Sequence, residues 1–139
     1  MIVVDTSGLL AAVDSSQRDH ARAAAALRAA DGPRLLSPFV LCELDYLINQ
    51  RVSAAAARAF LQQVVDQAYR LEPMGTEDIA AATDVIDRYR DLELGIADAS
   101  LVIIAERHGV TDLLTLDERH FRAVRGPGGQ PFRLLPADS

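Results

Sequence analysis

The 139-residue chain contains no lysine and a single cysteine, and none of its apolar runs approaches the ~20 residues needed to cross a bilayer. The absence of lysine argues against a P-loop nucleotide site, which needs one to bind phosphate. It also argues against phosphoaspartate enzymes, which generally place a lysine beside the aspartate. Cys42 has no partner for an internal disulfide, and no signal peptide is visible at the N-terminus. We therefore expect a cytoplasmic protein without a membrane segment.

What the chain does contain is typical of a globular domain. Half of the residues are hydrophobic, which argues against disorder, and the length suits one domain over residues 1–139. The net charge of −6 argues against a broad, non-specific grip on nucleic acid.

Short apolar runs typical of buried strands alternate with segments of helical periodicity. The predicted strands are 2–4, 35–36, 69–72, 111–116 and 132–135. The predicted helices are 7–13, 17–30, 38–50, 54–68, 77–91, a strongly apolar segment from 94 up to Gly109, and a helical turn at 118–124. This alternation predicts an α/β domain with a mostly parallel central sheet.

Four acidic residues recur where these elements meet. Asp5 follows the first strand, Asp117 follows the fourth, Asp98 opens the apolar helix, and Glu43 lies in the helix after the second strand. Because parallel strands end at the same edge of a sheet as the next helices begin, we expect the four carboxylates to converge. Each acid also has a local explanation: a helix cap for Asp5 and Asp117, the helix dipole for Asp98, and an ion pair with arginine for Glu43.

Four converging carboxylates would repel one another unless a cation lies among them. Oxygen ligands in that number suit Mg²⁺, or alternatively Mn²⁺. Zinc is disfavoured because His20, His108 and His120 show no ligand spacing and are expected on the surface or in loops. Two such ions can activate a water molecule and stabilise the leaving oxygen of a phosphodiester.

The acids lie within motifs that resemble those of PIN-domain ribonucleases. The motifs are Asp5-Thr6-Ser7, Glu43 in the third helix, Leu94-Gly95-Ile96-Ala97-Asp98-Ala99, and Thr115-Leu116-Asp117-Glu118-Arg119-His120-Phe121. Their order and the chain length are most similar to the VapC toxins of toxin–antitoxin pairs. The resemblance implies a three-layer α/β/α sandwich and an Mg²⁺-dependent endoribonuclease. It also implies a homodimer that is inhibited by a cognate antitoxin.

By motif match, Asp5, Glu43, Asp98 and Asp117 correspond to the family's acidic quartet, which would bind metal and carry catalysis. Ser7 and Thr115 match polar positions that support the quartet through hydrogen bonds. Three arginines near Asp117 are candidates for contact with RNA phosphates, although they also fit a solvated helix face: Arg119, Arg122 and Arg125.

Two other functions remain open from the residues alone. The acids could form a non-catalytic cleft that binds a basic peptide or a metal without turnover. Alternatively, Asp5 could be the nucleophile of a phosphatase, although the chain lacks both the usual lysine and a second aspartate two residues further on.

Overall fold

The computed structural model describes all 139 residues and contains a five-stranded, fully parallel sheet with strand order β3-β2-β1-β4-β5. The strands are β1 (Ile2–Val4), β2 (Arg34–Leu36), β3 (Arg70–Leu71), β4 (Asp112–Leu114) and β5 (Arg133–Leu135). In the central strand β1, Val4 lies opposite Leu36 of β2 on one side and Leu114 of β4 on the other. These three strands therefore end level with one another, and the residues that follow them share one edge of the sheet.

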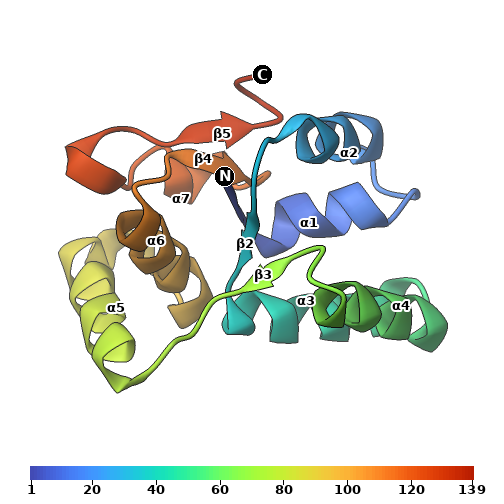
Figure 1. Ribbon diagram of the computed structural model, residues 1–139. Helices are drawn as coiled ribbons and strands as arrows, with labels where there is room; N and C mark the ends of the chain where they lie inside the picture. The colour runs from blue at the N-terminus through green and yellow to red at the C-terminus, as the bar shows by residue number, and fades with distance from the viewer.

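Helices cover both faces of the sheet, so the predicted α/β/α sandwich is confirmed. Figure 1 shows α1 to α4 on one side of the strands and α5 to α7 on the other. The helices are α1 (Thr6–Val13), α2 (His20–Ala29), α3 (Pro38–Arg51), α4 (Ala54–Val65), α5 (Thr76–Arg88), α6 (Ile96–His108) and α7 (Glu118–Phe121). Two short 3₁₀ helices, Arg90–Leu92 and Pro127–Gly129, complete the structure.

A single hydrophobic core of 31 buried residues lies on both faces of the sheet. All three residues of β1 are fully buried, as their aliphatic, β-branched composition predicts. Helix α6 is buried over most of its length, in agreement with its apolar sequence. No helix combines the length and apolar character that crossing a membrane requires.

Helices α2, α4, α5 and α7 end or begin short of their predicted bounds. For α2 and α4 the local reason is identifiable. Helix α2 begins at His20 because the Asp14 side chain accepts hydrogen bonds from both the backbone N–H and the hydroxyl of Ser16, which holds a turn there. Helix α4 ends at Val65 because Gln67 adopts a left-handed conformation with φ of 64°. That change of direction turns Tyr69 into the core.

Helix α1 passes unusually close to the end of β4. A Cβ atom on Gly8 would lie 2.5 Å from the carbonyl oxygen of Leu114, so only glycine allows this approach. The contact places the Ser7 hydroxyl 3.2 Å from the Thr115 hydroxyl, although 108 residues separate them in sequence.

A buried pair of serines joins the two helices on either side of this edge. The hydroxyl groups of Ser37, which caps α3, and Ser100, in α6, are 2.7 Å apart. Ser100 also donates to the carbonyl of Ala97 in its own helix. Because α3 carries Glu43 and α6 carries Asp98, this hydrogen bond helps to set the relative position of the two carboxylates.

Candidate active site

Asp5 lies at the centre of the C-terminal edge and is 6% exposed. Its backbone N–H donates to the carbonyl of Leu114, which joins it to β4 as well as β1. One carboxylate oxygen accepts from the backbone N–H of Thr6 at 2.8 Å, as expected of a residue that caps α1. The other oxygen accepts from the Thr115 hydroxyl at 2.6 Å and from the Ser7 hydroxyl at 3.0 Å.

The two hydroxyls are oriented by backbone groups. The Ser7 oxygen accepts from the N–H of Leu116 at 3.0 Å, and the Thr115 oxygen accepts from the N–H of Asp117 at 2.9 Å. Each hydroxyl is therefore left to donate its proton to Asp5. The positions that the sequence identified as supporting, Ser7 and Thr115, thus direct two hydroxyl protons at the same carboxylate oxygen.

Burial nevertheless makes the charged form of Asp5 unfavourable. Desolvation raises the pKa of Asp5 to about 6, although its hydrogen bonds to Thr115 and Ser7 oppose the increase. The negative charge of Asp98 raises the pKa of Asp5 further. A positive charge at this position would relieve both effects.

Asp98 is half-buried in the first turn of α6, where it accepts from the backbone N–H of Gly95 at 3.2 Å. Burial raises the pKa of Asp98, and the negative charges of Asp117 and Glu43 add to the increase. The structure thus brings all four predicted acids close enough to interact through their charges.

Glu43 is the most exposed of the four acids and approaches the others from α3. Its carboxylate accepts a hydrogen bond of 2.7 Å from the hydroxyl of Thr6, 37 residues earlier in the sequence. Thr6 was not among the predicted site residues. Its backbone N–H donates to Asp5 and its hydroxyl donates to Glu43, so this one residue connects two of the four carboxylates.

Asp117 is paired with His120, and this pair corrects the expectation that His120 is a surface or loop residue. The Nδ1 atom of His120 lies 2.7 Å from a carboxylate oxygen of Asp117, and its Nε2 atom lies 2.8 Å from the carbonyl of Leu92. Both partners are acceptors, so both ring nitrogens act as donors, which describes an imidazolium.

Burial alone would lower the pKa of His120, but the hydrogen bond to Asp117 and the charge of that carboxylate give a net increase. His120 thus brings a positive charge to the acids. This charge lowers the pKa of Asp98 and so opposes part of the increase that burial causes. The Asp-x-x-His spacing within one helical turn was the signal for this pair.

The four carboxylates fit a hard divalent cation by chemistry. All are oxygen donors. Burial is the main cause of the raised pKa values of Asp5 and Asp98, and the charges of neighbouring acids add to both. However, no three His, Cys, Asp or Glu side chains are grouped as a ready-made metal site.

The three arginines predicted to contact RNA have different surroundings. Arg122 is held in ion pairs with Glu118 at 2.9 Å and Asp138 at 2.7 Å. Arg125 lines a separate hollow with Arg88, between α5 and α6. Arg119 is exposed on α7, two residues after Asp117, and has no hydrogen-bond or ion-pair partner.

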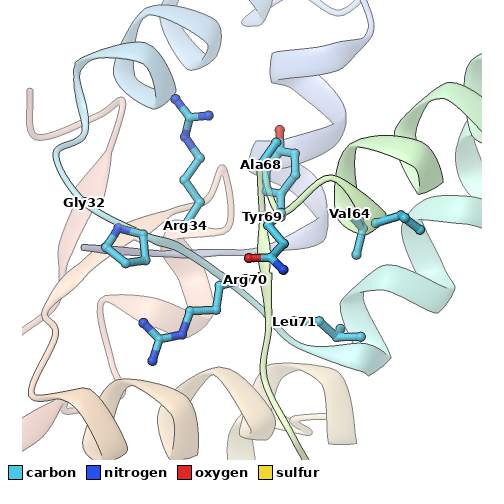
Figure 2. Close-up of a pocket in the computed structure, with 10 residues that line it drawn as sticks. Gly32, Arg34, Val64, Ala68, Tyr69, Arg70 and Leu71 are labelled. Carbon is cyan, nitrogen blue, oxygen red and sulfur yellow. The ribbon is translucent and has the colours of Figure 1, made fainter.

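A hollow of about 570 Å³ lies at the opposite edge of the sheet, where β2 and β3 begin. Figure 2 shows that Arg34 and Arg70, which line it, point away from one another. No carboxylate or histidine lines this hollow, so its chemistry differs from that of the acidic edge.

Comparison with known proteins agrees with this arrangement. Residues 2–127 match the PIN domain. The chain is 38% identical over 135 residues to Ribonuclease VapC26 of Mycobacterium tuberculosis (strain ATCC 25618 / H37Rv), and the alignment covers 97% of this chain and 100% of the relative. The crystal structure of M. tuberculosis VapC20, a sarcin–ricin loop cleaving toxin, is similar in fold with a TM-score of 0.78. Its sequence is 23% identical, over 84% of this chain and 90% of that one.

Proposed function

The chain belongs to the PIN-domain family, and from that premise we propose that it is a metal-dependent endoribonuclease and the toxin of a toxin–antitoxin pair. The observation that carries the proposal is the convergence of Asp5, Glu43, Asp98 and Asp117 at one edge of a parallel sheet. The likeness to a ribonuclease over nearly the whole chain supports the choice of RNA as substrate.

In the proposed site, Asp5, Glu43 and Asp98 hold Mg²⁺ or Mn²⁺, and Asp117 holds a second ion or orients the attacking water. Such ions supply an activated water and stabilise the leaving oxygen of the phosphodiester. The chain needs no covalent nucleophile and no lysine for this reaction.

The other residues of the site position these acids. Ser7 and Thr115 donate to the same oxygen of Asp5 and so fix the rotation of its carboxylate. Thr6 restrains Glu43, and His120 restrains Asp117 while placing a positive charge beside it. The buried serine pair, Ser37 and Ser100, holds α3 and α6 in a fixed relative position. Each of these contacts limits the number of conformations that the acids sample before substrate binds.

The proposal extends to partners. The family likeness supports a cognate antitoxin that blocks the site and a homodimeric assembly. The overall charge of −6 fits an enzyme that selects particular RNAs better than one that binds any nucleic acid.

The test is to incubate the purified protein with total RNA and Mg²⁺ and to sequence the new RNA 5′ ends. We expect discrete cleavage sites with wild type, and none with Asp98→Asn or in excess EDTA. Asp98→Asn retains the side-chain volume and the cap on Gly95 while removing a ligand charge, so circular dichroism should show an unchanged fold. Equal cleavage by wild type and Asp98→Asn would refute the proposal.

Two further measurements on the same variant and on wild type separate the alternative functions. Growth arrest that persists on expression of Asp98→Asn would favour binding without turnover. A phosphoryl group trapped on Asp5 would instead support the phosphatase mechanism.

A further inference from the structure

A third hollow, of about 230 Å³, directly adjoins the acidic edge. One wall is formed by Thr115 and Leu116, the residues whose other contacts hold Asp5 and Ser7 in the candidate active site. The facing wall is formed by Arg18 and Arg22, from the turn before α2 and from its first turn. A molecule bound in this hollow would therefore touch the backbone segment that supports Asp5.

The two arginines are only weakly engaged by the protein. Arg18 is exposed and makes no hydrogen bond or ion pair. Arg22 is 62% exposed and makes only a 3.7 Å contact with Asp19, which also lines the hollow, and a 3.5 Å contact with the carbonyl of Pro136. Exposed pairs of this kind contribute little to stability, so both guanidinium groups can turn towards a ligand.

The other acid at the hollow is bound by an arginine that does not line it. Glu118 lines it, but its carboxylate is bound by the guanidinium of Arg122 at 2.9 and 3.2 Å. Arg122 is in turn held by both oxygens of Asp138, at 2.7 and 2.8 Å. Arg122 therefore offsets part of the charge of Glu118 and is unavailable to a ligand itself, which leaves Arg18 and Arg22 as the cations that a ligand in this hollow would meet.

We infer that this hollow is a backbone-phosphate subsite for the RNA strand, in which Arg18 and Arg22 bind a phosphate close to the scissile one. The inference rests on the proposed ribonuclease function. An RNA strand that approaches four carboxylates on a protein of net charge −6 needs local cations to hold it. Arginine binds phosphate through paired N–H groups, and such contacts set the position of a strand without reading its bases.

The first experiment measures RNA binding as a function of salt. The probe is a fluorescein-labelled single-stranded RNA of 20 random nucleotides in Mg²⁺, and every protein also carries Asp98→Asn so that the RNA stays intact. We expect Arg18→Ala together with Arg22→Ala to weaken binding about 10-fold. The slope of log Kobs against log salt should fall by about 0.7 for each phosphate that the variant no longer neutralises.

The matched control is Arg28→Ala, which removes an exposed arginine from the other end of α2. It removes one positive charge from the same helix but lies outside the hollow, so it should alter neither the affinity nor the slope by a comparable amount. A double variant that binds like the Arg28→Ala control would overturn the subsite.

The second experiment places the phosphate relative to the cleavage site. Once the 5′ ends are mapped, a substrate is made with a neutral methylphosphonate at one linkage at a time. We expect one linkage near the scissile bond to slow cleavage by wild type several-fold and to have no further effect on the Arg18→Ala, Arg22→Ala double variant. Equal sensitivity of both proteins at every linkage would contradict the assignment.

The two proposals fail in distinguishable ways. If wild type neither cuts nor binds RNA, the ribonuclease function is wrong and the subsite is wrong with it. If wild type cuts RNA and the double variant retains the affinity, salt slope and methylphosphonate pattern of wild type, only the subsite is wrong.

Discussion

The hydroxyl of Thr115 donates to the carboxylate of Asp5 at 2.6 Å, across 110 residues of sequence, in a buried position at the end of two adjacent strands. The same hydroxyl oxygen accepts the backbone N–H of Asp117. One side chain therefore links the acid after β1 to the acid after β4. The consequences of this link and of its neighbours can be tested one residue at a time.

Replacing Thr115 with valine should impair catalysis while retaining the shape of the core. Valine removes the donor to Asp5 and the acceptor for the N–H of Asp117, so both carboxylates lose a restraint. We expect RNA cleavage to slow about 10-fold or more and to require a higher Mg²⁺ concentration. Thr115→Ser keeps the hydroxyl and should recover most of the activity. A valine variant with wild-type rates and Mg²⁺ dependence would show that this contact does not position the acids.

Replacing Asp5 with asparagine should stabilise the metal-free protein at neutral pH. The pKa of Asp5 is about 6 in the folded chain, above the ordinary value of 3.8, so folding favours the protonated form. The stability associated with this group is complete below pH 3.8 and is lost as the pH rises through 6. Asparagine removes the buried charge, and the gain at pH 8 should be on the order of 2 kcal/mol.

The measurement is thermal unfolding in EDTA at pH 4 and pH 8. Asp5→Asn should unfold at a higher temperature than wild type at pH 8, and the difference should shrink towards pH 4. Asp84→Asn serves as the control because Asp84 is exposed and unpaired. An Asp5→Asn protein that is less stable than wild type at pH 8 would mean that hydrogen bonding to the carboxylate outweighs its desolvation.

Replacing Gly8 with alanine should disturb both the fold and the site. The new Cβ would meet the Leu114 carbonyl at 2.5 Å, where backbone cannot move aside cheaply. We expect a loss of about 1–3 kcal/mol in the free energy of unfolding, as is typical of overpacking. RNA cleavage should fall as well. If the new Cβ pushes α1 away from β4, Thr6 and Ser7 move with the helix and lose their contacts with Glu43 and Asp5.

Gly75→Ala provides the comparison for this variant. Gly75 precedes α5 with an ordinary φ of −94°, and the only heavy atom near a new Cβ is a carboxylate oxygen of Asp78 at 4.0 Å. Gly75 is the N-cap residue of α5, where alanine is less favourable than glycine, so the cost should be about 0.5–1 kcal/mol, below that of Gly8→Ala. Equal denaturant midpoints for the two alanine variants would show that α1 can shift away from β4 without penalty.

Arg119 and Arg122 should differ in their effect on RNA binding, although they lie three residues apart. Arg119 is exposed without a partner, whereas Arg122 is committed to Glu118 and Asp138. We expect Arg119→Ala to weaken RNA binding about 3-fold with a smaller salt slope. Arg122→Ala should have little direct effect on the slope. The reverse order, measured with the same fluorescein-labelled RNA, would show that Arg122 leaves its ion pairs to bind RNA.

Most of the fold could be predicted from local patterns. The buried run Ile2–Val4, the Ser37-Pro38 helix start and the apolar segment before Gly109 each appear in the structure as the sequence indicates. Burial on both faces and a fixed φ at proline are properties of adjacent residues, so a short window of sequence contains them. The ends of α2 and α4 were less accurate, because the Asp14 turn and the left-handed Gln67 were not recognised.

The sequence by itself determined the kinds of residue and their places at the ends of elements: four acids after strands or early in helices, in an order that resembles one family. Only the tertiary structure decided which atoms meet. It placed the hydroxyl of Thr6 on Glu43, paired Asp117 with His120, and turned Arg122 towards Asp138 instead of a ligand. The physical reason is that strand order and the approach of α1 to β4 depend on packing between distant segments, and no local pattern specifies the contacts that such packing creates.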